Sequence, residues 1–332
     1  MTRLHALALT LGTSLLTAAA GCGGDDAASV DAGDETPCGR LVIPGGDGTN
    51  PGFIKPRLDG DDEDTRPGDG ECILVQAWSE SGDVFTEQTP DLSCLNTAST
   101  DTPTTVEVTL TSRVADFQSG DDVPDATVTV FDGVDINGTP VETATSGAGG
   151  AITFTIPAGR ERFGFKRVAD DYLDTLLLNQ YLQPTNPTQS ISVIQQVSNG
   201  TAAALPGLVG ITRTPGKGIL AGTIRDCAGN ELSGVIATVS TTSGTVSHVG
   251  GTRTYYFSQS GLPVRNTVEI ATTENGLFAA LEIDPTATAY VQMWGVLSQA
   301  DLEAGTVTLI GELEVPVVGD VVITGSYEPL RN

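Results

Sequence analysis

The chain has 332 residues, and its charge is one-sided, with 42 acidic residues against 16 basic ones and a formal net charge of −26. Because affinity for nucleic acid depends on clusters of Lys and Arg, this balance excludes nucleic-acid binding as the main role. Aromatic residues make up only 5% of the chain, which argues against a surface on which bases stack. The length predicts about two domains.

The start of the chain has the features of a secretory signal. A short basic segment, residues 1–5, precedes an apolar run over residues 6–16, and small residues follow up to Cys22. The run is too short to span a bilayer, which takes about 20 apolar residues. We therefore assign residues 1–21 to a signal peptide that is removed from the mature protein.

The junction Ala19-Ala20-Gly21-Cys22 resembles a bacterial lipobox, in which an aliphatic residue and two small residues precede a cysteine. The first position departs from the pattern, because Ala stands where Leu is usual. The resemblance implies that Cys22 becomes the first mature residue and carries lipid on its sulfur and its amino group. Gly23 stands where Asp retains many lipoproteins in the inner membrane, which favours the outer membrane. The alternative is ordinary cleavage after Ala20, which releases a soluble protein.

A tether follows the predicted anchor. Residues 22–70 are rich in Gly, Asp, Pro and Thr and hold few bulky apolar side chains. Such a segment cannot bury enough apolar surface to fold, so we predict a disordered acidic tether. The Asp-rich runs at residues 59–71 and 132–138 offer oxygen ligands, but neither has EF-hand spacing. We interpret them as solvated linker and hairpin turn, and we predict no metal and no cofactor.

Five cysteines occur in the chain. If Cys22 is lipidated, four disulfide candidates remain: Cys38, Cys72, Cys94 and Cys227. An even number in an exported chain predicts two bridges, for which three pairings are possible. We favour Cys72 with Cys94, because these residues flank a predicted hairpin over residues 73–85, and this leaves Cys38 to pair with Cys227. No CxxC pair occurs, so a zinc or redox centre has no support.

From residue 104 onward, apolar and polar residues alternate with the period of half-buried strands. Clear examples are residues 106–110, 126–130 and 152–156, with Gly, Asp and Asn turn signals between them. Short strands at such spacing predict an all-β chain of tandem Ig-like sandwiches. We place the first sandwich at residues 71–185 and the second at residues 218–332.

The order of strands and turns in the first sandwich recurs in the second, which resembles the carboxypeptidase regulatory-like domain, a prealbumin-like seven-stranded sandwich. The elements G-x-I-x-D-x-x-G-x-x-[LI]-x-G-V stand almost intact within residues 218–296, whereas residues 104–170 match less well. The resemblance implies that four glycines serve as turn or crossing residues rather than ligands: Gly222, Gly229, Gly234 and Gly276. It implies a stability or interaction module, and fold alone does not fix function.

The sequence predicts a helical connector at residues 186–217. Apolar residues at 191, 193–194 and 197 follow helical spacing, and Ser190 precedes them as a candidate N-cap. We expect a short amphipathic helix that packs on a sandwich edge.

Catalytic constellations are missing from the sequence. His248 is the one histidine of the predicted mature chain, and the G-x-S-x-G, P-loop and GxGxxG patterns do not occur. We expect a non-catalytic, lipid-anchored envelope protein whose sandwiches bind or scaffold, with other envelope proteins or glycans as partners. The alternative is an accessory subunit or a divergent hydrolase at a sandwich rim. A cluster of His248 with a Ser and an acid would favour the hydrolase, and an exposed patch over residues 255–257 would favour binding.

Overall fold

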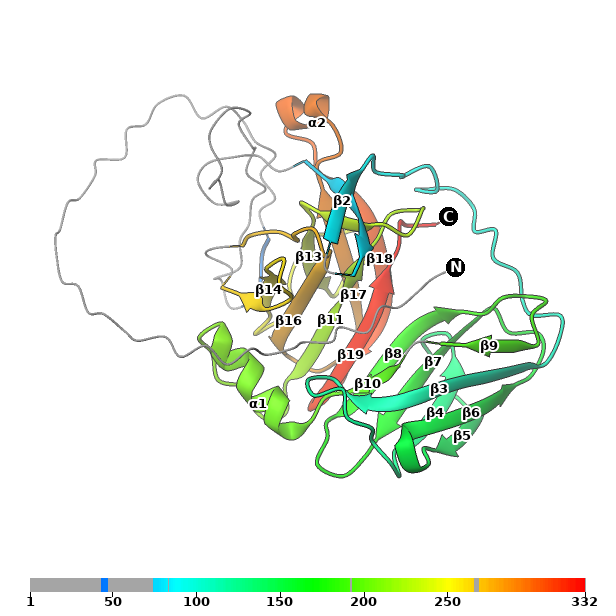
Figure 1. Cartoon of the computed structure of the whole chain (residues 1–332). Coiled ribbons are helices and arrows are strands. Elements are labelled where there is room, and N and C mark those ends of the chain that lie inside the picture. Colours follow the sequence, from blue (N-terminus) through cyan, green and yellow to red (C-terminus); the bar gives the residue numbers. More distant parts are fainter. Residues whose placement is uncertain (1–42, 47–73, 83, 192, 266–268, 332) are drawn as a thin grey trace.

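The structure is a computed structural model, and it describes residues 43–46, 74–82, 84–191, 193–265 and 269–331. Strands are the main regular structure among these residues, and two short α-helices occur among them. Figure 1 shows two layered halves side by side, one coloured cyan to green and the other yellow to red. The predicted all-β sandwich class is confirmed.

One sheet of nine strands runs through both halves (Figure 1). In spatial order its strands are β15 (Pro263–Val264), β14 (Arg253–Phe257), β16 (Leu277–Ile283), β11 (Gly218–Ile224), β19 (Val321–Tyr327), β8 (Asp174–Tyr181), β7 (Arg162–Val168), β4 (Thr127–Asp132) and β5 (Glu142–Thr145). The last strand, β19, lies parallel to both β11 and β8. It therefore joins the two halves, a connection that the tandem pattern of the sequence does not indicate.

A second sheet completes the first half. It contains β3 (Val108–Asp116), β6 (Ala151–Ile156), β9 (Thr188–Ser190) and β10 (Ile194–Gln196), and a 3-10 turn, η1 (Ala148–Gly150), precedes β6. Along β6 exposed and buried residues alternate, as the sequence predicts. Phe154 of β6 and Phe163 of β7 pack on Phe165, with ring centroids 5.4 and 4.9 Å apart. These three rings are part of the hydrophobic core of the first half.

The second half has its own core between the nine-stranded sheet and a three-stranded sheet. The three strands are β13 (Ile236–Ser240), β17 (Thr286–Gly295) and β18 (Thr308–Val317). Val291 and Met293 of β17 are fully buried in one cluster with Phe278 of β16 and Ile323 of β19. The alternation that predicts these strands therefore reflects burial between two sheets.

A hairpin near the beginning of the described chain also belongs to the second half. The predicted hairpin is confirmed as β1 (Gln76–Ser81) and β2 (Val84–Gln88), which pair antiparallel. β1 pairs in addition with β12 (Glu231–Ser233), and Trp78 Nε1 donates a hydrogen bond of 2.9 Å to Ser233 Oγ. Residues that precede the first half in sequence thus add strands to the second.

The two helices are α1 (Asn199–Leu208) and α2 (Gln299–Ala304), at opposite ends of the molecule in Figure 1. The predicted helix with Ser190 as N-cap is wrong in position, because α1 begins at Asn199 and Ser198 caps it through a 3.2 Å bond from Thr201 N. The predicted N-cap Ser190 instead ends β9, and Ile194 begins β10, and both of these strands pair with β3. Pairing with a distant strand overrides the local helical spacing.

The disulfide joins Cys94 to Cys227, whose Cα atoms are 5.8 Å apart. The predicted pairs Cys72–Cys94 and Cys38–Cys227 are therefore wrong. Beyond β2 the chain runs along the second half, where Cys227 N donates to Asp91 O at 2.8 Å, and this brings Cys94 to Cys227. The other cysteines, Cys22, Cys38 and Cys72, lie outside the described residues, as do the predicted signal peptide and most of the predicted tether.

The predicted hairpin turn at residues 132–138 is confirmed, because it joins the antiparallel strands β4 and β5. Asp132 forms an ion pair with Arg160. The other Asp-rich run, residues 59–71, lies outside the described residues. In the described part of the chain, no group of three or more His, Cys, Asp and Glu is placed to hold a metal ion. None of the helices described there is long and apolar enough to cross a membrane.

Candidate functional site

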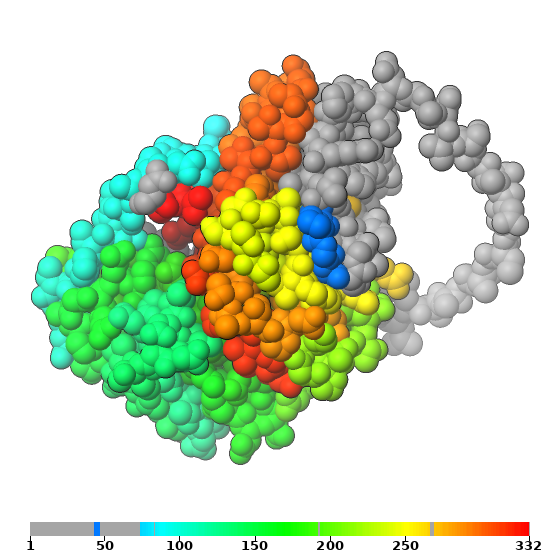
Figure 2. Space-filling view, turned by 180° about the vertical axis from the view of Figure 1, so that it is seen from behind, coloured from blue at the N-terminus to red at the C-terminus, as the bar shows by residue number. Residues whose placement is uncertain are grey.

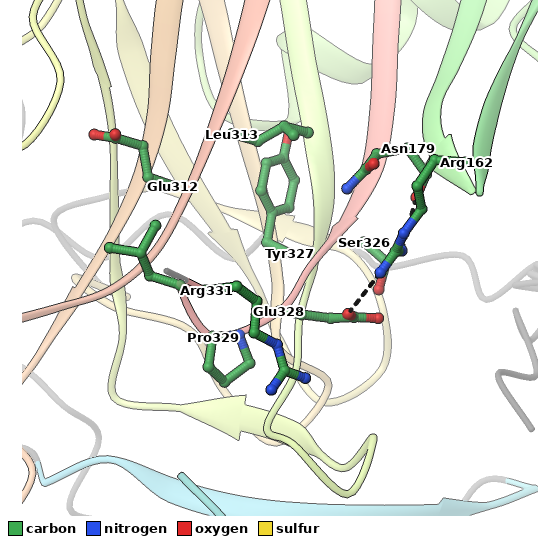
Figure 3. A pocket seen from close by; sticks show the side chains of 10 residues that line it. Arg162, Asn179, Glu312, Leu313, Ser326, Tyr327, Glu328, Pro329 and Arg331 are labelled. Carbon is green, nitrogen blue, oxygen red and sulfur yellow. Dashed lines mark hydrogen bonds and ion pairs between the residues drawn. The ribbon is translucent and has the colours of Figure 1, made fainter. Parts of the chain in front are cut away.

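A pocket of about 230 Å³ opens at the seam between the halves (Figure 3). The first half supplies Arg162 and Asn179, and the second half supplies residues 312–313 and 326–331. Because β19 pairs with strands of both halves, its C-terminal end brings these segments together. The pocket therefore exists because one continuous sheet holds the two halves together.

Tyr327, the last residue of β19, forms the apolar wall of the pocket. Its side chain is 2% exposed, and its ring meets Phe278 edge-on at 5.3 Å. A Cβ at Gly222 would lie 2.5 Å from Tyr327 Cε2 and 2.4 Å from Gly325 O, so only glycine leaves room for this ring. The expectation that Gly222 is a crossing residue is confirmed. Burial raises the pKa of the Tyr327 hydroxyl further above physiological pH, at which a tyrosine is already neutral.

Arg162 provides the cationic side of the pocket. Its guanidinium forms an ion pair with Asp101 and lies 3.9 Å from Glu328, as the dashed line in Figure 3 marks. Its Nη1 donates to Asn179 O at 3.4 Å, and its Cζ lies 5.3 Å from the centroid of the Tyr181 ring. These contacts from separate segments hold the guanidinium in one place.

Glu312 borders the pocket on the side opposite Arg162, with Leu313 and Tyr327 between them, and its side chain points away from Tyr327 (Figure 3). This carboxylate accepts hydrogen bonds from Gln292 Nε2 at 2.8 Å, Ser243 Oγ at 2.6 Å and Gly244 N at 2.8 Å. The carboxylate of Glu312 is thus held away from the pocket, and the opposite charges that meet at the pocket are those of Arg162 and Glu328.

The lining favours binding over covalent chemistry. Ser326 Oγ accepts a 3.2 Å hydrogen bond from Arg225 Nη1, and Arg225 in turn forms a buried ion pair with Glu231 at 3.1 Å. An activated serine needs a base that takes its proton, whereas a guanidinium only donates. The lining residues that the structure describes include no histidine.

His248, the residue of the alternative hydrolase hypothesis, lies away from this pocket, where residues 43–46 run against it. His248 N donates a hydrogen bond to Pro44 O at 2.8 Å, and His248 O accepts one from Gly46 N at 3.3 Å. Figure 2 shows residues 43–46 (blue) against the yellow surface. The side chain is 6% exposed, and its Nδ1 accepts from Val239 N at 3.3 Å. A Ser-His-Asp triad needs Nδ1 to donate to a carboxylate, so this arrangement does not favour the hydrolase.

The aromatic run at residues 255–257 does not form the exposed patch that would favour binding. Tyr255 is 4% exposed, Tyr256 is fully buried and Phe257 is half-buried. Ala237 N donates to Tyr256 Oη at 3.0 Å, which ties β14 to β13. These aromatic residues stabilise the second half.

Asp226 and Gly276, in the region that resembles the carboxypeptidase regulatory-like domain, have structural roles. Asp226 Oδ1 accepts from Ala228 N at 3.0 Å and Asn230 N at 2.8 Å, and its Oδ2 accepts from Asp91 N at 3.0 Å. Gly276 has a φ of +62°, and a Cβ there would lie 2.6 Å from Ile224 O. The motif therefore specifies turns, as expected.

Sequence reasoning missed the pocket residues. Arg162, Glu312, Tyr327 and Arg331 lie far apart in the chain, and no local pattern links them. Arg331 Nη1 donates to Cys94 O at 3.3 Å, so the disulfide segment also borders the pocket. Only the pairing of β19 with both halves assembles the site.

No family model matches the chain, and no curated protein matches it. Among solved structures it is similar to the Bacillus anthracis TIE protein, with 13% identity, 68% of this chain and 34% of that chain covered, and a TM-score of 0.23. It is also similar to the shaft pilin SpaA from Lactobacillus rhamnosus GG, with 11% identity, 68% of this chain and 98% of that chain covered, and a TM-score of 0.21. A third similar structure is hydroxyquinol 1,2-dioxygenase from Pseudomonas putida DLL-E4, with 18% identity, 37% of this chain and 67% of that chain covered, and a TM-score of 0.21.

The chain spans about a third of the length of the TIE protein. Similarities with TM-scores near 0.2 carry no argument about activity. What the structure itself defines is a β-sandwich protein with a pocket where its two halves meet.

Proposed function

We propose that this chain is a non-catalytic, lipid-anchored protein of the bacterial cell envelope that binds or scaffolds other molecules. The observation that carries the proposal is the Cys94–Cys227 disulfide, which joins residues 133 positions apart. Such bonds form and persist in oxidising compartments outside the cytoplasm. The bond therefore supports the export signal in residues 1–21, which rests on an independent part of the sequence.

The proposed anchor is Cys22. A single acyl chain gives only reversible membrane binding, because each buried methylene contributes about 0.8 kcal/mol. A diacylglycerol on the sulfur together with an acyl group on the amine makes attachment effectively permanent. Gly23 favours the outer membrane, and residues 22–70 would act as the tether that separates the body from the lipid surface.

The proposed role of the body is to present a rigid surface. The continuous sheet ties the first half to the second, so Arg162 of the first half is held close to Glu328 of the second. A pocket of about 230 Å³ bordered by Arg162, Glu328 and Arg331 suits a small polar group. Envelope proteins and glycans, which carry such groups, are the proposed partners, and the second half is the proposed carboxypeptidase regulatory-like module.

Labelling with radioactive palmitate tests the anchor. Cells that express the wild-type chain should incorporate label into it and retain it in the membrane fraction. Cys22→Ala should lose the label and appear in soluble fractions, whereas Cys38→Ala, a matched loss of another early cysteine, should keep both label and location. An unlabelled wild-type protein in the medium would contradict the proposal.

A further inference from the structure

One side chain in the core of the first half carries a charge without a counter-charge. Arg167 of β7 is 2% exposed, and its Nε donates to Thr175 O at 3.3 Å. No carboxylate in the described part of the chain pairs with it, although its neighbour Lys166 pairs with Asp174 at 3.1 Å. Burial lowers the pKa of the Arg167 guanidinium to about 9, so the group is still charged at neutral pH. Buried charges in proteins are normally paired.

A second polar side chain in the same layer is also unsatisfied. Gln196, the last residue of β10, is fully buried. Among the described residues, neither its amide nitrogen nor its amide oxygen has a hydrogen-bond partner. Buried amides in native proteins nearly always have partners, and an orphan calls for an explanation such as a bound ion or water.

The strand registers turn both side chains toward one interior. Arg167 stands opposite Val128 in the β4–β7 ladder, and Val128 and Phe165 both belong to the core of the first half. Ile194, two residues before Gln196, belongs to that same core. Because side chains two residues apart on a strand share a face, Arg167 and Gln196 point between the two sheets.

Both side chains also lie at the same end of the sandwich. Leu173 N donates to Val197 O at 2.9 Å, so the residue after Gln196 lies against the segment that leads into β8. Thr175, two residues beyond Leu173, stands opposite Arg167 in the β7–β8 ladder. The end of β10 and the end of β7 therefore both lie beside the segment that leads into β8.

We propose that Arg167 and Gln196 form a buried site for a small monovalent anion between β7 and β10. A guanidinium has five N–H donors and an amide nitrogen has two, so both side chains can donate to one acceptor. A single cation is balanced by a single negative charge, and a fully buried location admits only a small ion such as formate or bromide. The net charge of −26 repels anions from the molecule as a whole, so binding there depends on this one local cation.

Thermal unfolding with bromide or formate tests the site, with sodium sulfate holding the ionic strength constant. The melting temperature of the wild-type protein should rise with the logarithm of anion concentration above Kd, by about 4 °C at a hundredfold excess over Kd. Arg167→Met should abolish the rise, and Gln196→Met should move its onset about tenfold to higher concentration. Lys166→Met, which removes the exposed neighbouring cation, should keep the full rise.

A wild-type melting temperature that does not respond to either anion would overturn the proposal, as would an equal response in Arg167→Met. Crystals of the wild-type protein in bromide give a readout that needs no variant. An anomalous bromine peak between Arg167 and Gln196 is expected. Ordered water alone at that position, at saturating bromide, would overturn the proposal.

Discussion

Removal of the Cys94–Cys227 disulfide should cost a large part of the stability of the protein. The bond closes a loop of 133 residues. Loop-closure entropy for that length predicts that the double substitution Cys94→Ala and Cys227→Ala lowers the free energy of unfolding by about 5 kcal/mol. For a folded body of this size, the loss corresponds to a melting temperature lower by about 9 °C.

Differential scanning calorimetry of the wild-type and substituted proteins measures this difference. Each single substitution breaks the same bond, so Cys94→Ala and Cys227→Ala alone should each have nearly the effect of the double substitution. A decrease below about 3 °C for the double variant, or single effects that add up to the double effect, would refute the assignment of this bond.

Three further substitutions test the seam between the halves. Gly222→Ala should destabilise the protein by about 2–3 kcal/mol in urea unfolding, because its Cβ would lie 2.4 Å from Gly325 O; an unchanged midpoint would contradict the close crossing. Arg225→Met leaves the carboxylate of Glu231, which is 6% exposed, without its partner, and should cost about 3–5 kcal/mol by the same assay; a loss below about 1 kcal/mol would mean that the pair is not buried. Tyr327→Phe removes a buried hydroxyl that has no partner in the described structure, and should leave stability equal or higher by up to about 1 kcal/mol; a clear loss would show that the hydroxyl is bonded.

Local patterns predict many of the strands, though not β9 and β10. In β6 the inward residues Ile152, Phe154 and Ile156 alternate with outward residues, so burial on one face is visible in the sequence. The turn at residues 132–138 and the structural glycines Gly222 and Gly276 were also predicted, because their chemistry is set by neighbours in sequence or by a recurring motif.

Long-range pairing was beyond those patterns. The predicted helix begins too early because residues 191–197 have helical spacing in the sequence, whereas Thr188–Ser190 and Ile194–Gln196 pair with β3, a contact that no local pattern indicates. The disulfide was misassigned because sequence proximity favoured Cys72 for Cys94, whereas the segment after β2 follows the second half to Cys227.

The pocket and the buried Arg167 were missed for the same physical reason. Arg162 and Tyr327 meet only because β19 pairs in parallel with strands of both halves. Arg167 follows Lys166 in a strand where an exposed cation is the usual expectation, and its burial depends on the sheet that covers it.

Intact mass spectrometry of the protein purified from its native membrane tests the central claim most directly. The account predicts a mature chain that begins at Cys22 and carries the mass of a diacylglycerol and an additional acyl group. A mature chain with an unmodified amino terminus, or one that begins at another residue, would contradict lipid anchoring and the envelope role that depends on it.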